Sequence, residues 1–219
     1  TSTTGSVEKW FDYLEKPDEM NWDGNLEIEL PEYPDVTFRW YPEKMDAVTG
    51  NEVTQLYTGM PIWNTYFCDL TGDGFPDLCS TLTIGSGIID SRIIVYDYAN
   101  GASYTLEDRG KYDYSLRLNE TDGCLWVVKK AYNSDDIVAS GKLLFADNCL
   151  RVAYTLYETH KFTSVTIRND GEDTLRITIG SDEKDLAVGE ETSLAYTDFA
   201  LRTIKLSSFG ELDYTVTYD

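Results

Sequence analysis

The sequence predicts a mainly β protein, with antiparallel sheets in two lobes and one N-terminal helix. Short runs that alternate apolar and polar residues recur along the chain, as strands with one buried face do. Glycine, asparagine and aspartate punctuate these runs, and such residues favour turns. The 16 tyrosines and 5 tryptophans also favour strands. With 42% apolar residues among 219, the chain can bury real cores.

The predicted helix covers residues 6–16, "SVEKWFDYLEK". Its apolar residues follow helical spacing: Val7, Trp10, Phe11 and Leu14. Ser6 is placed as an N-cap, and Pro17 ends the segment because proline cannot continue a helix. Everything after this segment is expected to form strands and turns.

The first predicted strand, residues 25–30, shows the pattern of the others. Leu26, Ile28 and Leu30 occupy one face, and acidic residues occupy the other. The further predicted strands of the first lobe are 36–40, 53–58, 62–67, 78–85, 91–98, 102–108, 112–118, 123–132 and 137–147. We therefore expect residues 1–150 to form a mixed, mostly β domain behind the N-terminal helix.

The second lobe is expected to be a small β-sandwich formed by residues 151–219. Its strands recur every eight to twelve residues with turn residues between them, a spacing typical of sandwiches. The segments concerned are 164–180, 184–196, 201–208 and 212–219. About 70 residues are few for a separate sandwich, so a core shared with the first lobe stays an alternative.

The charge balance limits the partners that the protein can bind. There are 39 acidic and 18 basic residues, which gives a formal charge of −21. Such a surface repels phosphate backbones and anionic lipids, so we expect no nucleic-acid partner. No run approaches the roughly 20 apolar residues of a membrane helix, so no membrane insertion is expected within this fragment. A cationic peptide or a metal ion suits this charge better, although the charge could also serve solubility alone.

An acidic loop in "CDLTGDGFPDL", residues 68–78, predicts a calcium site. Alternate positions of a tight loop point inward, and calcium prefers several hard oxygen ligands. The predicted ligands are the side chains of Asp69, Thr71, Asp73 and Asp77 and the carbonyl oxygen of Phe75. Gly72 and Gly74 allow the curved path. The alternative is a glycine- and aspartate-rich turn that holds no ion.

The segment "DLTGDGFPDL" resembles the calcium loop of integrin-type propeller repeats. It departs from that pattern at Thr71, where the family carries a carboxamide or carboxylate, and it occurs once. The resemblance implies a structural calcium ion and does not extend to a propeller fold. A catalytic role for the ion is not expected, since no general base stands beside the loop.

The four cysteines are Cys68, Cys79, Cys124 and Cys149. They show no Cys-x-x-Cys spacing, so a structural zinc site is not expected. Cys68 and Cys79 bracket the acidic loop and would face each other if its flanking strands pair. A disulfide and two free thiols both stay open, because geometry decides between them.

Residues 59–118, "GMPIWNTYFCDLTGDGFPDLCSTLTIGSGIIDSRIIVYDYANGASYTLEDRGKYDYSLRL", resemble the C-terminal extracytoplasmic region of membrane-embedded metallopeptidases of the BlaR type. Residues 36–52 fit the same resemblance, which spans roughly residues 22–150. It implies a sensor that faces outward, at the cell surface or outside the cell, after a membrane zinc protease domain. That protease needs a His-Glu-x-x-His motif, whereas this chain has the single histidine His160. No catalytic residue is therefore predicted in this chain.

These observations predict a non-catalytic extracellular binding or sensor domain. The alternative is a secreted protein that binds carbohydrate or a cell-wall fragment through exposed aromatic side chains, for which the candidates are Trp22, Trp40, Trp63 and Trp126. An enzyme of another type would require a cleft in which several polar side chains converge. His160 is expected to be a surface or structural residue.

Overall fold

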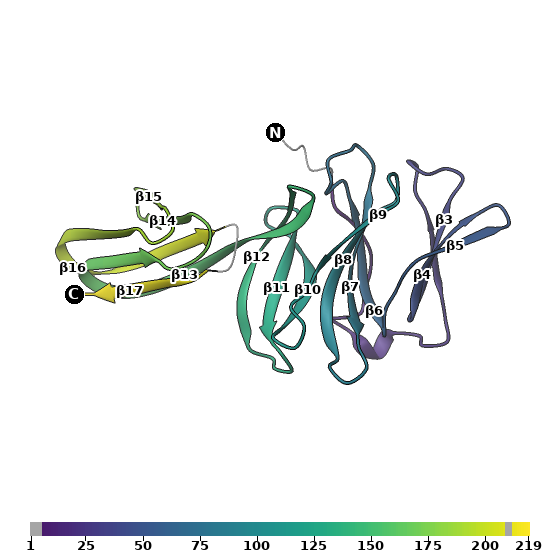
Figure 1. Cartoon of the computed structure of the whole chain (residues 1–219), viewed down its shortest axis with the longest axis horizontal. Coiled ribbons are helices and arrows are strands. Elements are labelled where there is room, and N and C mark those ends of the chain that lie inside the picture. Colours follow the sequence, from purple (N-terminus) through teal and green to yellow (C-terminus); the bar gives the residue numbers. More distant parts are fainter. Residues whose placement is uncertain (1–5, 209–211) are drawn as a thin grey trace. The chain divides into compact units, whose positions relative to one another are not determined.

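The computed structural model of the protein describes residues 6–208 and 212–219. In these ranges the chain is mainly β, as predicted, and its strands pair in antiparallel sheets (Figure 1). The only helix within them is the short 3-10 helix η1, Pro17–Glu19. No helix in the described part of the chain is long and apolar enough to pass through a lipid bilayer.

The predicted N-terminal helix is wrong. Residues Glu8–Asp12 form strand β1, which pairs with β6 (Ile62–Cys68) and carries a bulge between Lys9 and Phe11. The Trp10 ring stacks on Phe67, with ring centroids 5.8 Å apart, and Phe11 is buried. An isolated helix of eleven residues is marginal in water. An available sheet edge therefore outweighs the helical spacing of the apolar residues.

Contacts divide the chain into two compact units. Unit 1 comprises Thr1–Val138 and Phe145–Leu150, and unit 2 comprises Ala139–Leu144 and Arg151–Asp219. The division falls within strands β12 (Ile137–Ala146) and β13 (Cys149–Asn169). The division into domains of residues 1–150 and 151–219 stays a prediction.

Unit 1 contains three groups of strands. One sheet has the order β2-β3-β4-β5, and a second has the order β1-β6-β7-β8-β9. Strand β10 pairs with β11 along its whole length. The strands not yet delimited are β2 (Leu26–Glu29), β3 (Thr37–Tyr41), β4 (Lys44–Thr49), β5 (Glu52–Thr58), β7 (Asp77–Ile84), β8 (Asp90–Asp97), β9 (Ala102–Leu106), β10 (Tyr112–Asn119) and β11 (Cys124–Ala131).

The centre of unit 1 is the pair β6–β7, which is buried on both faces. On one face Phe67 packs against Phe38 of β3, and the indole of Trp40 donates a hydrogen bond to the Ile62 carbonyl oxygen at 3.2 Å. On the other face the Asn64 side chain donates to the Leu116 carbonyl oxygen of β10 at 2.9 Å. Strands covered on both sides need apolar or fully hydrogen-bonded residues, which explains their weak alternation.

Unit 2 is organised by two long strands, β13 and β16 (Glu191–Ser208). Residues 154–162 of β13 pair with 200–208 of β16, and after an irregularity residues 164–168 pair with 191–195. Strand β14 (Leu175–Ile179) joins the later half of β16 and pairs with β15 (Asp182–Leu186). Strand β17 (Tyr214–Tyr218) pairs with the second half of β13.

Both halves of the long strands contribute to one apolar core. Its buried members are Phe162, Val165, Ile167, Leu175, Ile177, Ile179, Leu186, Ile204 and Leu206. Val165 and Ile167 belong to the half of β13 beside β17, whereas Ile204 and Leu206 belong to the half of β16 beside β14. The irregularity in the β13–β16 pairing therefore lets one pair of strands supply two sides of a core.

Candidate binding site: the acidic turn and its cavity

The acidic turn joins β6 to β7 and comprises Asp69–Pro76. The Asp69 carboxylate accepts hydrogen bonds from the backbone amides of Gly72, at 2.7 Å, and Gly74, at 3.0 Å. Both glycines have positive φ, at 81° and 93°, a region that other residues enter at a cost. The turn thus depends on the residues that the sequence singled out.

Asp77 closes the turn at the start of β7, opposite Cys68. Its side chain is buried, and one oxygen accepts hydrogen bonds from the amides of Leu70 and Thr71, both at 2.9 Å. The Thr71 hydroxyl donates to the other oxygen at 3.3 Å. Burial raises the pKa of Asp77 from 3.8 to about 6, against the lowering effect of these hydrogen bonds, and the Asp97 carboxylate adds to the rise.

Asp73 connects the turn to the end of strand β8. The Asn100 side-chain amide donates to Asp73 and to Asp97, at 2.8 Å in each case. Tyr33 supports the same region, because its hydroxyl donates to the Pro76 carbonyl oxygen at 3.2 Å and its ring stacks on Phe75. The turn is therefore fixed to a second loop and to an aromatic side chain.

The structure brings the predicted metal ligands Asp69, Thr71, Asp73 and Asp77 onto one turn, with Phe75 between them. The three carboxylates turn toward backbone and side-chain donors within and beside the turn. In the described ranges, no group of three or more His, Cys, Asp or Glu side chains is placed to hold a metal ion. These hydrogen bonds fix the turn in the structure, and the calcium site stays a prediction.

A cavity of about 230 Å³ lies beside the turn. Its lining combines acidic, apolar and small groups: Ser6, Glu8, Leu30, Glu32, Phe67, Cys68, Asp69, Gly74 and Pro76. Three acidic residues, Glu8, Glu32 and Asp69, thus line one hollow together with the apolar residues Leu30 and Phe67. A site of this composition can accept a positively charged group on an apolar stem.

Sequence reasoning found Asp69 but missed Glu8 and Glu32. Glu8 reaches the cavity because β1 is a strand, in which Glu8 pairs with Phe67. Glu32 follows β2, far from the turn in sequence. No local pattern indicates these two residues, since only the pairing of distant strands brings them together.

The thiols of Cys68 and Cys79 are both free and buried, with their sulfur atoms 3.8 Å apart. Of the two outcomes left open by the sequence, the structure shows the free form. Cys68 also lines the cavity. Cys124 and Cys149 are likewise free.

The candidate aromatic platform is not formed by its four tryptophans together. Trp40 is only 1% exposed and belongs to the core of unit 1. Trp63 and Trp126 are half-buried, and their indoles donate to Thr83 at 2.8 Å and to Asp122 at 2.9 Å. Trp22, at 59% exposure, remains as a stacking surface.

Two larger cavities, of about 410 and 420 Å³, lie among the described residues of unit 2. In the first, Arg176 forms two hydrogen bonds with Asp185, at 2.7 and 2.8 Å. In the second, Arg202 lies over the Tyr196 ring and pairs with Asp198 at 2.5 Å. The charged side chains at these hollows are engaged with each other, so the cavity in unit 1 is the better candidate.

A second polar cluster lies on β13 and β17. The hydroxyls of Tyr214 and Tyr218 each donate to the Glu158 carboxylate at 2.6 Å, and the His160 ring packs on Tyr218. These contacts connect the first half of β13 to the strand paired with its second half. We assign this cluster a structural role.

A scan of protein-family models finds none that matches this chain, and a search of curated proteins finds no match either.

Proposed function

We propose that this chain is a non-catalytic binding or sensing module that takes a cationic group into the cavity of unit 1. One observation carries the proposal: the acidic residues Glu8, Glu32 and Asp69 line the same hollow as the apolar residues Leu30 and Phe67. An ammonium group would meet the carboxylates while its methylene stem lies on Leu30 and Phe67. A lysine-containing peptide is the ligand class that fits this chemistry.

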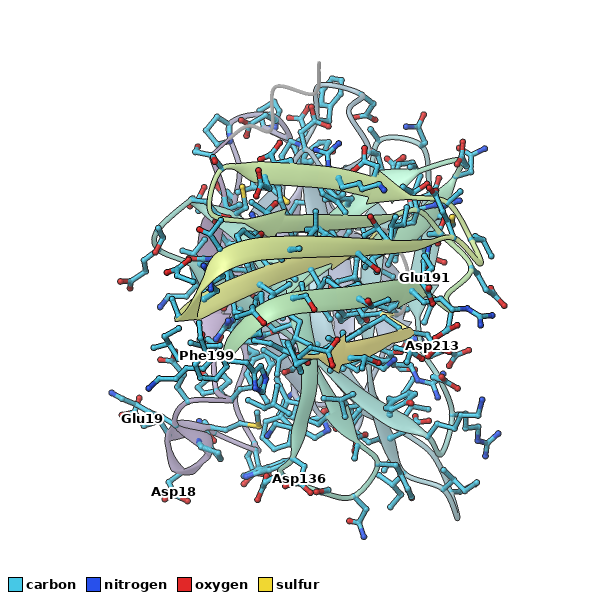
Figure 2. All side chains as sticks on the ribbon, turned by 90° about the vertical axis from the view of Figure 1, so that its left-hand side faces the viewer. Asp18, Glu19, Asp136, Glu191, Phe199 and Asp213 are labelled. Atoms are coloured by element: carbon cyan, nitrogen blue, oxygen red, sulfur yellow. The ribbon has the colours of Figure 1, made fainter. Side chains whose placement is uncertain are left out.

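The size of the cavity favours a single side chain over a polymer. At about 230 Å³ the cavity is smaller than the roughly 300–1,000 Å³ of typical small-molecule pockets. That volume suits one lysine side chain. The net charge of −21 adds long-range attraction for a basic peptide. Figure 2 labels exposed carboxylates from both units, among them Asp18, Asp136 and Glu191, which contribute to this charge.

The resemblance of residues 59–118 gives the proposal its biological setting. In that setting the chain is an outward-facing ectodomain of a membrane metallopeptidase-type receptor, at the cell surface. Unit 2 would be a small β-sandwich that serves as a spacer or as a surface for another protein. The long strands that supply two sides of its core support the sandwich assignment.

Binding of a lysine-containing peptide and of its acetylated form tests the proposal. Acetylation removes the charge and leaves the stem, so we expect affinity to fall at least tenfold, as measured by calorimetry. The Glu8→Gln/Glu32→Gln variant should lose a similar factor. Glu52→Gln/Glu120→Gln is the matched control, because it also removes two charges and both residues are exposed and do not line the cavity. Equal affinity for both peptides would reject the site, and an equal loss in the control would indicate a long-range charge effect.

Structural calcium in the acidic turn is a second part of the proposal. An ion would have to use the remaining lone pairs of Asp69, Asp73 and Asp77 or replace some of their hydrogen bonds. Thermal melting with calcium and with chelator checks this. We expect calcium to raise the melting temperature and Asp73→Ala to abolish the rise. An unchanged melting curve at millimolar calcium would remove the ion from the proposal.

The second candidate function is binding of carbohydrate or cell-wall material, which exposed Trp22 favours. An indole at 59% exposure offers a flat face for a sugar ring. Glycan-array binding that is lost in Trp22→Ala and kept in Glu8→Gln would favour this function over the acidic cavity.

A further inference from the structure

Two thiols lie side by side at the base of the acidic turn. In the β6–β7 ladder Cys68 pairs with Asp77, and Cys79 pairs with Tyr66. Residues two apart on a strand point to the same face, so the two cysteines are diagonal neighbours on one face. Their sulfur atoms are 3.8 Å apart, close to van der Waals contact.

The two thiols differ in access. Cys68 lines the cavity of about 230 Å³, whereas Cys79 is completely buried. A reagent that enters the cavity therefore meets Cys68 first.

We propose that Cys68 and Cys79 are a redox pair, which a small disulfide oxidises through the cavity with Cys68 as the entry thiol. The Cys68 sulfur attacks the small disulfide, forms a mixed disulfide and releases one small thiol. The Cys79 sulfur then attacks the Cys68 sulfur, forms the Cys68–Cys79 bond and releases the second small thiol. The two hydrogens of the protein thiols end on the two released thiols, and the small disulfide is the oxidant.

The geometry needs only a local change for this bond to form. The sulfur atoms must approach from 3.8 Å to about 2.0 Å. Cys68 is the last residue of β6 and is followed by the turn, so its backbone can shift without disturbing the middle of the ladder. The bond would join the two ends of the acidic turn and would remove the Cys68 thiol from the cavity wall. Oxidation would thereby fix the turn and alter the proposed binding site.

The other two cysteines supply a clean background for the test. Cys149 is exposed and Cys124 is half-buried, and each thiol contacts a carbonyl oxygen of its own turn, at 3.2 Å for Cys149 and 3.5 Å for Cys124. The full chain carrying Cys124→Ser and Cys149→Ser keeps the pair and removes competing thiols. Cys79→Ala and Cys68→Ser are then made in this background. Alanine suits position 79 because the site is closed to water.

Each folded protein is incubated with 2-hydroxyethyl disulfide. Mass spectrometry then measures the mass of the intact protein, and peptide mapping locates the modified cysteine. The background protein should lose two hydrogen atoms and yield a linked Cys68–Cys79 peptide. Cys79→Ala should stop at a stable mixed disulfide on Cys68, and Cys68→Ser should gain no adduct. The linked form should melt higher by about 5 °C, and reduction should reverse this rise.

Three results would overturn the inference. These are a mixed disulfide that persists in the background protein, an adduct on Cys79 in Cys68→Ser, and no reaction unless the protein is denatured. If Cys79→Ala does not fold, the proposal is still tested by two results in the background protein: the linked Cys68–Cys79 peptide and the reversible rise in melting temperature. The probe is uncharged, so a failure of the proposed cation binding would not change these readouts.

Discussion

Asn64 shows how one buried polar side chain can join three strands. Its amide nitrogen donates to the Leu116 carbonyl oxygen at 2.9 Å and to Asp12 at 3.2 Å, and its oxygen accepts from the Thr81 amide at 2.9 Å. The sequence gives no signal for this role, because asparagine is common in turns. The side chain stands in the middle of β6, where the β6–β7 register shifts between Ile62 and Asn64.

Asn64→Ala should therefore destabilise unit 1 strongly. The change leaves the Thr81 amide and the Leu116 carbonyl without their partner inside the core, and we expect a loss of about 2–4 kcal/mol. Urea denaturation measures this loss. Asn64→Asp is the matched variant: it keeps the acceptor for the Thr81 amide but places a buried carboxylate oxygen against the Leu116 carbonyl and the Asp12 carboxylate, so it should be at least as destabilising as Asn64→Ala at neutral pH. A change below about 0.5 kcal/mol in Asn64→Ala would contradict the structural role.

Glu158 makes the stability of unit 2 depend on pH. Burial opposes its ionisation, but hydrogen bonds from Tyr214 and Tyr218 and the nearby His160 outweigh burial and lower the pKa of Glu158. An acid with a lowered folded-state pKa contributes stability above its unfolded-state pKa and loses that contribution as pH falls through the folded value. Unit 2 should thus weaken on acidification below about pH 4.5.

Glu158→Gln removes this titration and isolates its effect. The amide keeps the shape but can accept with only one atom, so we expect a loss of about 1 kcal/mol at pH 7, discounted for partial exposure. The difference from the wild type should shrink as pH falls. Melting curves across the acid range check this, with Glu172→Gln as an exposed control. A difference that is constant with pH would show that Glu158 acts through shape alone.

At the scale of elements, the acidic turn was predictable and the N-terminal strand was not. The turn follows from glycines and aspartates within ten residues, whose local hydrogen bonds do not depend on the rest of the chain. The segment Glu8–Asp12 has helical spacing of its apolar residues, and only the edge of β6, more than 50 residues away, makes it a strand. A pattern of neighbouring residues contains no information about pairing with β6.

The turn predicts an unusual effect of Asp77→Asn. Because the pKa of Asp77 rises from 3.8 to about 6 on folding, the folded state binds this proton more tightly than the unfolded state. Stability should therefore fall as pH rises between about 4 and 6 in protein kept with chelator. Asp77→Asn keeps an acceptor for the Leu70 and Thr71 amides, so it should remove this pH dependence and be at least as stable at pH 7.

Asp77→Ala is the control for Asp77→Asn. It removes the acceptor of two backbone amides as well as the charge, and it should lower stability by about 1–3 kcal/mol at pH 7. Denaturant unfolding of the two variants between pH 4 and pH 7 gives the comparison. If both variants lose the same stability, the cost of the buried carboxylate is smaller than the pKa shift indicates.

At the scale of the whole molecule, the class of fold was predictable and the path of the chain was not. Alternation and turn residues indicate antiparallel strands wherever they occur. The contacts, however, assign Ala139–Leu144 to unit 2 and return Phe145–Leu150 to unit 1. A single boundary in the sequence cannot describe this assignment, in which residues 139–144 belong to unit 2 and residues 145–150 belong to unit 1. The assignment depends on the strands with which β12 pairs.

Because residues 139–144 belong to unit 2, two fragments of the chain should differ in stability. A fragment of residues 139–219 keeps the part of β12 that belongs to unit 2, including buried Leu143, and should unfold cooperatively. In the sheet β12 is hydrogen-bonded to β13, so a fragment of residues 151–219 exposes that edge of β13 and should melt lower or fail to fold. Circular dichroism melting compares them, and Leu143→Ala in the longer fragment should lower its melting temperature. Equal melting temperatures would mean that β12 adds nothing to unit 2.

The irregular pairing of β13 with β16 also bears on how fast unit 2 can fold. Tyr154 pairs with Ser208, so the far end of this ladder closes a loop of more than fifty residues. Neither side of the core has its complete set of strands until these two have met. Loop closure has an entropic cost that must be met before the contacts stabilise the chain, and folding rates fall as contacts become more distant in sequence. Refolding of unit 2 should accordingly take milliseconds to seconds, with the joining of these two strands as its slow step.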